Sequence, residues 1–223
     1  MSGKLFVVAT PIGNLEDITL RAIRTLKECD VILCEDTRRA KILLKHYGIE
    51  KPLISYFEGN EEKRIPEILK LLKEGKRVAL ISDAGTPLIS DPGYRLVRRC
   101  REEGIEVLPV PGPSAVITAL SVSGLETDRF MFLGFPPQRR GKRRNLLEWV
   151  KNFEGSLVFY VSPYDIKEFL EEVLEILGDR KVCICREMTK LFEEYIYGKL
   201  SEVKDKVKEK GEFVVVIGKG NYL

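Results

Sequence analysis

The chain has 223 residues, enough for one large domain or two small ones. Its formal net charge is +3, from 37 Lys and Arg against 34 Asp and Glu, so attraction to nucleic acid has to come from local patches. The first apolar run, at 5–9, is too short for a signal peptide, and no stretch approaches a membrane span. We therefore expect a cytoplasmic protein.

The five cysteines indicate reduced thiols in a hydrophobic core, because their number is odd and they lie in apolar or helical stretches. Cys183 and Cys185 alternate in a stretch that is typical of a strand, so both side chains should point to one face. His46 is the only histidine and no partner motif accompanies it. We expect no metal site.

The first half of the chain alternates apolar runs with residues at helical spacing, the pattern of a mostly parallel α/β sheet. Thr37 is the expected N-cap of the second helix, and Pro66 predicts that the third becomes regular only near Ile65. The expected strands are 5–9, 30–35, 52–57, 76–81 and 105–110, and the expected helices are 15–26, 37–47, 60–74, 94–103 and 114–122.

The pattern changes near 124–128, which predicts an N-terminal domain at 1–124 and a C-terminal domain at 125–223. Strands that follow one another without a helix imply a mixed or partly antiparallel second sheet. Here the expected strands are 130–135, 156–161, 181–186, 194–197 and 212–217, and the expected helices are 145–153, 166–177 and 201–210.

The segment LISDAGTPLISDPG, at 80–93, is the strongest candidate for a ligand-binding loop. It follows a buried apolar run, and Gly85 and Gly93 allow backbone conformations that other residues avoid, while Pro87 and Pro92 make the loop rigid. In open parallel sheets, ligands bind beyond the carboxyl ends of the strands. The alternative is an ordinary strand-to-helix connection, but these usually take about 2–6 residues.

Two other turns follow strands in the same way. Thr10–Asn14 follows the first strand, and the proline-bracketed turn at 111–115 opens a helix whose free N–H groups can meet a ligand. Glu35 and Asp36 end the second strand and are candidate site acids, although a cluster of caps and ion pairs explains them equally well. Neither a dinucleotide-binding nor a nucleoside-triphosphate-binding glycine motif occurs.

A basic segment at 139–144 places five cations in six residues beside two prolines. The functional interpretation is contact with a phosphate backbone, since like charges at this density repel one another unless an anion lies among them. The alternative is a solvated face. The segment is expected to be a loop, and its cations are Arg139, Arg140, Lys142, Arg143 and Arg144.

Six segments together resemble the bacterial ribosomal RNA small subunit methyltransferase I family, part of the tetrapyrrole methylase superfamily. They are VVATPIGNLEDITLRAI, EDTR, SDAGTPLISDPGYRLV, PVPGPSA, GLETDRF and EMTKLFEEYIYGKLSEV. The resemblance implies two α/β domains with the cofactor in the cleft between them, and a homodimer. It also implies an enzyme that uses S-adenosylmethionine to methylate the 2′-hydroxyl of a cytidine in the decoding region of 16S rRNA, within the small ribosomal subunit.

The cofactor contacts of this superfamily fall on the three turns and on one strand of the second domain. They are Pro11, Ala84, Gly85, Thr86, Ile89, Ser114 and Ala115, together with Tyr160 and Val161. The chain departs from the pattern of the family it resembles in the segment YVSPYD, where members commonly show a glutamate and a His-Arg pair. It also ends soon after Gly218, where many members continue into a helical segment, and Thr86 stands where the tetrapyrrole enzymes often carry an acid.

Methyl transfer to a ribose hydroxyl needs an acceptor for the hydroxyl proton. Asp36 and Asp83 are the candidates, and Arg38 is a candidate for holding a flanking phosphate. Two other functions remain open. One is a methyltransferase that acts on a small molecule such as a tetrapyrrole, and the other is a nucleotide-binding or RNA-binding protein without catalysis.

Overall fold

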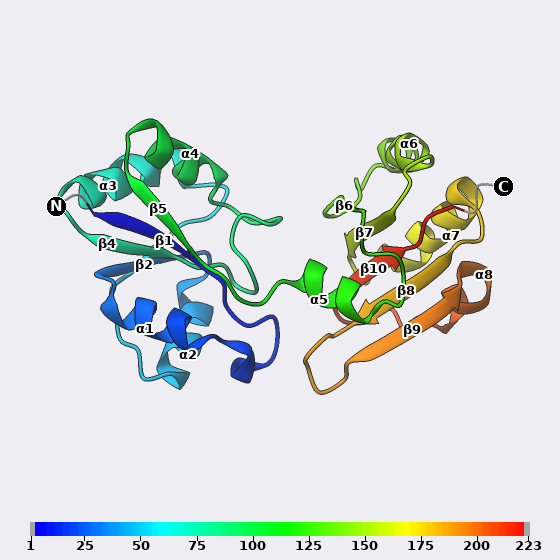
Figure 1. The fold of residues 1–223 in the computed structure, drawn as a ribbon, viewed down its shortest axis with the longest axis horizontal. Helices are drawn as coiled ribbons and strands as arrows, with labels where there is room; N and C mark the ends of the chain where they lie inside the picture. Colours follow the sequence, from blue (N-terminus) through cyan, green and yellow to red (C-terminus); the bar gives the residue numbers. More distant parts are fainter. Residues whose placement is uncertain (1–2, 221–223) are drawn as a thin grey trace. The chain divides into compact units, whose positions relative to one another are not determined.

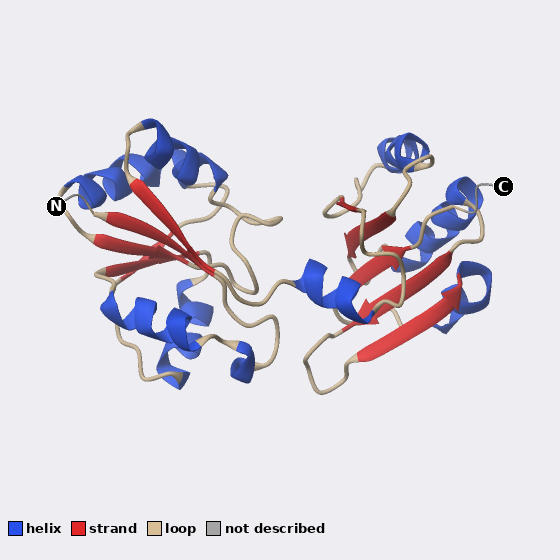
Figure 2. Ribbon diagram, in the orientation of Figure 1, coloured by secondary structure: helices blue, strands red, loops and turns tan. Residues whose placement is uncertain are grey.

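The computed structural model describes residues 3–220, which form two separate five-stranded sheets with helices packed on them (Figures 1 and 2). The chain divides into two compact units, Met1–Ser114 and Ala115–Leu223. Helix α5 (Ala115–Val122) belongs to the second unit, because it packs against strand β10 (Phe213–Ile217).

The first sheet is parallel throughout, as predicted, with the strand order β3-β2-β4-β1-β5. Its central strands are continuous apolar runs, and all four residues of β2 are buried. The strands are β1 (Lys4–Val8), β2 (Val31–Cys34), β3 (Leu53–Ser55), β4 (Arg77–Leu80) and β5 (Glu106–Val110).

Helices cover both faces of this sheet (Figure 1). On one face α1 (Leu20–Glu28) and α2 (Thr37–His46) bury residues such as Leu26 and Leu44 against it. On the other face α3 (Glu61–Lys73) and α4 (Tyr94–Glu102) bury apolar residues spaced three or four apart.

Two expectations about helix starts in this unit were wrong. Asp36, not Thr37, is the N-cap of α2, since its carboxylate accepts the backbone N–H of Arg38 at 2.8 Å. Helix α3 is regular from Glu61 onward although Pro66 lies inside it. Pro66 is on the exposed side of the helix, and the apolar stripe buried on the opposite side offsets the lost hydrogen bond.

The second sheet is mixed, as predicted, with the order β6-β7-β10-β8-β9 and one parallel pair, β6 with β7. Helices α6 (Arg140–Val150), α7 (Ile166–Leu177) and α8 (Leu200–Val203) contribute to the apolar core on one face. The remaining strands are β6 (Phe130–Phe132), β7 (Ser156–Val161), β8 (Lys181–Arg186) and β9 (Glu194–Lys199).

The helix expected at 201–210 is shorter than predicted. It consists of α8 followed by the 3-10 turn η2 (Lys204–Lys206), because Val207 is the only residue beyond Val203 in that stretch that is buried. A second 3-10 turn, η1 (Leu15–Asp17), precedes α1.

All five cysteines are free and buried, as expected of core thiols. The Sγ atoms of Cys183 and Cys185 lie 3.8 Å apart on the same face of β8, which confirms the predicted alternation. Across residues 3–220, none of the helices has the length and apolar character needed to cross a bilayer.

Candidate active site

Three loops that leave neighbouring strands of the first sheet are joined to one another. Thr10, after β1, forms a two-residue bridge with Gly85, in which each backbone N–H donates to the other residue's carbonyl at 3.0 Å. The hydroxyl of Thr86 donates to the carbonyl of Pro113, after β5, at 2.9 Å. The predicted cofactor residues of these turns, from Pro11 to Ser114, therefore belong to one region.

The 82–93 loop needs glycine at this junction. Gly85 has a φ of +80°, and a Cβ there would lie 3.2 Å from the side chain of Ile12. Two further residues in the loop, Leu88 and Ser90, adopt φ values of 74° and 59° although they are not glycine. Such conformations are strained and persist where the surroundings fix them. The predicted contacts Ala84 and Ile89 are exposed on this loop.

The far end of the loop is held by a glutamate that sequence analysis missed. Glu61 is 7% exposed, and its Oε1 accepts the hydroxyl of Tyr56 at 2.8 Å and the backbone N–H of Gly93 at 3.1 Å. The only signal in the sequence is an acidic residue in the first turn of a helix, which is common. The loop is thus fixed at both ends.

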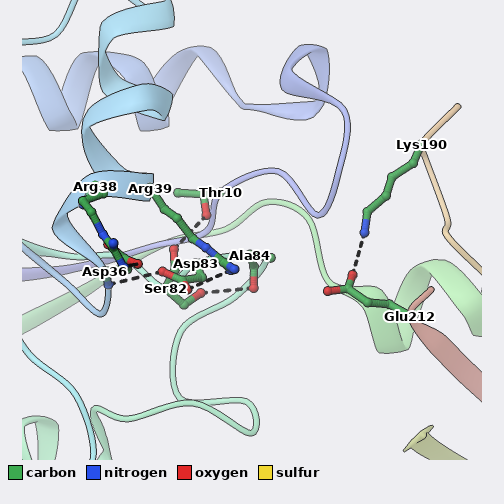
Figure 3. Close-up of polar contacts among 9 residues, drawn as sticks. All are labelled: Thr10, Asp36, Arg38, Arg39, Ser82, Asp83, Ala84, Lys190 and Glu212. Carbon is green, nitrogen blue, oxygen red and sulfur yellow. Dashed lines mark hydrogen bonds and ion pairs between the residues drawn. The ribbon is translucent and has the colours of Figure 1, made fainter. Parts of the chain in front are cut away.

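The two candidate catalytic aspartates lie together at the carboxyl ends of β2 and β4 (Figure 3). The backbone N–H of Asp36 donates to Asp83 Oδ1 at 3.4 Å, and Arg39 Nη1 contacts Asp83 Oδ2 at 3.2 Å. Arg38 donates to both oxygens of Asp36, at 3.2 and 3.1 Å. These hydrogen bonds from Arg38 lower the pKa of Asp36.

Two other carboxyl groups near this pair have raised pKa values. Burial raises the pKa of Glu35, and the charge of Asp83 raises it further. Burial also raises the pKa of Asp91 to about 6, and Glu35 and Asp83 add to that shift. Asp91 was missed because an aspartate before Pro-Gly is typical of a turn.

The carboxyl groups at this edge of the sheet fit a small ligand that carries positive charge. Asp36 and Asp83 each have an arginine partner, and Glu35 and Asp91 add negative charge that a bound cation would offset. In the described part of the chain, no three His, Cys, Asp or Glu side chains are arranged to hold a metal ion.

The candidate residues of the second unit differ from each other in accessibility. The ring of Tyr160 packs edge-to-face with Phe132 and Phe135, at centroid distances of 4.8 and 5.5 Å. The side chain of Val161 is 1% exposed and lies in the apolar core.

In the same unit, Lys190 pairs with Glu212 at 2.7 Å (Figure 3), an ion pair that no sequence motif indicated.

The basic segment at 139–144 is not the loop that was expected, because α6 begins at Arg140. The carboxylates that pair with its cations belong to the neighbouring helix α7. Arg143 is buried and binds Glu172, with Nε to Oε2 at 2.5 Å and Nη2 to Oε1 at 3.1 Å. Arg140 also contacts Glu172, and Arg144 pairs with Glu175. These three cations hold two helices together.

Comparisons with known proteins agree with this architecture. The family model of the tetrapyrrole (corrin/porphyrin) methylases matches residues 4–204. A relative from Thermotoga maritima named ribosomal RNA small subunit methyltransferase I is 55% identical, over 96% of this chain and 98% of its own length. One of the same name from Halalkalibacterium halodurans is 50% identical, over 96% of this chain and 75% of its own.

Among solved structures, the chain resembles a cobalt precorrin-4 methyltransferase of cobalamin biosynthesis. The TM-score is 0.71 at 18% identity, over 96% of this chain and 94% of the other, which shows the shared fold. The chain belongs to the tetrapyrrole (corrin/porphyrin) methylase family and, within it, to the group of proteins named ribosomal RNA small subunit methyltransferase I.

Proposed function

We propose that this protein is an S-adenosylmethionine-dependent methyltransferase that modifies the 2′-hydroxyl of a cytidine in the decoding region of 16S rRNA. The observation that carries the proposal is the junction of Thr10 with Gly85 beside clustered carboxylates, in a chain whose relatives are named rRNA methyltransferases. We further propose that it acts in the cytoplasm as a homodimer, as its resemblance to the family implies.

The cofactor would be held by the joined loops of the first unit. When bound, it supplies a methyl group on a sulfonium cation. The carboxylates of Glu35 and Asp91 would stabilise positive charge in this region. The loop residues of this cofactor site are Pro11, Ala84, Gly85, Thr86, Ile89, Ser114 and Ala115.

Asp83 is the better candidate of the two aspartates for accepting the proton of the ribose hydroxyl. A carboxylate has about four lone-pair positions, and Asp83 uses two of them, for the Asp36 N–H and for Arg39. Asp36 already accepts three hydrogen bonds from Arg38, and its pKa is lowered. We assign Asp36 a positioning role, as the cap of α2 and the partner of Arg38.

Arg38 remains the candidate for contact with a phosphate next to the target nucleotide. Its side chain is 88% exposed although it pairs with Asp36, so part of its guanidinium faces solvent. An arginine that already has a carboxylate partner is held in one orientation. A phosphate that arrives beside it meets a donor group that is already ordered.

The second candidate function is methyl transfer to a small molecule. The ion pairs of the 139–144 segment favour it, because they occupy three of its five cations with glutamates of α7, and within residues 3–220 only Arg139 and Lys142 of this segment have no ion pair.

The test is transfer of labelled methyl from S-adenosylmethionine to small ribosomal subunits that lack their native modifications, followed by alkaline hydrolysis. A 2′-O-methyl group prevents cleavage of the adjacent phosphodiester, so one labelled dinucleotide containing cytidine is expected. Labelled mononucleotides alone would show base methylation. No labelling, with cofactor binding seen by calorimetry, would contradict the rRNA substrate.

The variant Asp83→Asn tests the proton acceptor. It should lose turnover and keep cofactor affinity within about a few-fold, because the amide keeps the size of the side chain but accepts no proton. Asp128→Asn, at an exposed position, is the matched control and should keep full activity. Normal turnover by Asp83→Asn would remove this residue from the mechanism.

A further inference from the structure

Helices α1 and α2 carry an excess of positive charge that the chain as a whole does not have. Together they contain seven Lys and Arg residues and a single acid, Glu28. The whole chain has 37 cations against 34 anions. The positive charge is thus concentrated on one pair of helices, and the cations are Arg21, Arg24, Lys27, Arg38, Arg39, Lys41 and Lys45.

Most of these cations have no carboxylate partner. Arg38 and Arg39 pair with Asp36 and Asp83, and Glu28 pairs with Arg77 at 3.3 Å. Within residues 3–220 no ion pair involves the other five cations, and all five are exposed. They are Arg21, Arg24, Lys27, Lys41 and Lys45.

The helices on the opposite face of the same sheet differ in this respect. On α3 and α4, Lys73 and Arg99 both contact Glu103, at 2.6 and 2.9 Å, and Arg98 contacts Glu102 at 2.8 Å. In the part of the chain that the structure describes, six of the eight Lys and Arg residues of α3 and α4 are in ion pairs, against two of seven on α1 and α2. Cations without a carboxylate partner are therefore concentrated on the face covered by α1 and α2.

The unpaired charge extends from the candidate active site. Helix α2 begins directly after Asp36, and at 1.5 Å per residue Lys41 and Lys45 lie about 4.5 Å and 10.5 Å beyond Arg38 along the helix axis. These three residues share the exposed side of α2. Helix α1 covers the same face of the sheet (Figure 1), so its cations widen the charged surface.

We propose that the exposed face of α1 and α2 is the surface on which the RNA substrate docks through its phosphate backbone. This inference rests on the proposed function and deepens it, because it states where the polynucleotide lies relative to Asp36 and Asp83. Phosphates bind exposed cations by releasing condensed counterions. Leu20 and Ile42, 88% and 73% exposed on the same helices, add apolar surface for bases or sugars.

Binding of a labelled single-stranded RNA with the decoding-region sequence, measured by anisotropy without cofactor over a range of salt concentrations, tests the proposal. The variant removes four charges by exchange to Gln, at Arg21, Arg24, Lys41 and Lys45. The control removes two Arg and two Lys from the opposite face, Arg98, Arg99, Lys70 and Lys73. A third variant keeps the charge, with Arg21→Lys and Arg24→Lys.

The α1–α2 variant should bind at least about tenfold more weakly at moderate salt, and its log–log salt slope should fall by about 3, or 0.7 for each of four contacts. The control should change the slope by less than about 1, and the charge-keeping variant should bind like the wild type. Thermal unfolding shows whether each variant is folded. Equal losses in both quadruple variants, or none in the α1–α2 variant, would overturn the proposal.

Two further results separate this proposal from others. If the α1–α2 variant binds free RNA normally but fails to bind the assembled small subunit, the surface contacts a ribosomal protein and the RNA proposal is wrong. If the wild type binds RNA through this face but transfers no methyl group to small subunits, the proposed function fails while the docking surface stands.

Discussion

Replacement of Arg143 by methionine should destabilise the second unit strongly, although the residue lies in a run of cations that looks like surface. Its side chain is 2% exposed and that of Glu172 is 3% exposed, and the two form a bidentate pair. A third contact, to Glu168 at 3.0 Å, completes the arrangement. The variant removes the guanidinium and keeps most of the apolar stem.

The expected loss is set by the charge that remains. Removing one partner of a buried ion pair typically costs about 3–5 kcal/mol, because the other charge stays buried without compensation. Here Arg140 Nε remains 3.3 Å from Glu172, so the lower end of that range is expected, about 3 kcal/mol, or roughly a hundredfold in the unfolding equilibrium. Adding Glu172→Met should restore most of the loss, since no buried charge is then left.

Urea unfolding followed by circular dichroism and by the fluorescence of Trp149 measures this difference. Trp149 is the only tryptophan and lies on the same helix as Arg143. The exposed neighbour Lys142→Met is the control and should stay within about 0.5 kcal/mol of the wild type. A loss below about 1 kcal/mol for Arg143→Met, or a double variant no more stable than the single one, would refute the reasoning.

Two further predictions concern the loop at 82–93. Burial raises the pKa of Asp91 to about 6 from an ordinary 3.8. Between these two pKa values the folded state keeps a proton on Asp91 that the unfolded state has released, so the free energy of unfolding falls as the pH rises from about 4 to about 6. The free energy of unfolding of Asp91→Asn should therefore rise by about 1–2 kcal/mol relative to that of the wild type between about pH 4 and pH 7, after discounting for partial exposure. Urea midpoints of the two proteins that change equally with pH would contradict this. Gly85→Ala should weaken cofactor binding measured by calorimetry, because the added Cβ would contact Ile12. Gly104 is the control, since its φ is +70° and the space around it is open; Gly104→Ala should cost only about 1 kcal/mol of stability and leave cofactor binding unchanged.

The strands could be predicted from the sequence because burial on both faces leaves a local trace. The runs that became β2 and β10 are apolar at every position and stop at Glu35 and Gly218. The start of α2 was less predictable, since Asp36 and Thr37 are both good caps and only the backbone decides between them. The regular helix through Pro66 depended on burial of an apolar stripe, which outweighs local preference.

That the loops after β1, β4 and β5 meet could be predicted for a related reason, because the carboxyl ends of neighbouring parallel strands lie at one edge of the sheet. The carboxyl ends of neighbouring strands bring Asp36 and Asp83 together, as expected. The contributions of Glu61 and Asp91 were not visible, because they depend on the folded structure. Glu61 binds the N–H of Gly93, 32 residues further along the chain, and the pKa of Asp91 is raised first by its burial and then by the charge of Glu35.

The two basic regions of this chain show why charge density alone does not locate an anion site. The cations at 140–144 are adjacent in sequence, and α7 presents glutamates to them at 168, 172 and 175, a spacing that forms one stripe on a helix. The cations of α1 and α2 are dispersed and attract less notice in the sequence. In the described residues five of these seven cations have no ion pair, so their charge stays available to a partner. A run of like charges points to an external anion only when no helix of the same chain carries the complementary stripe.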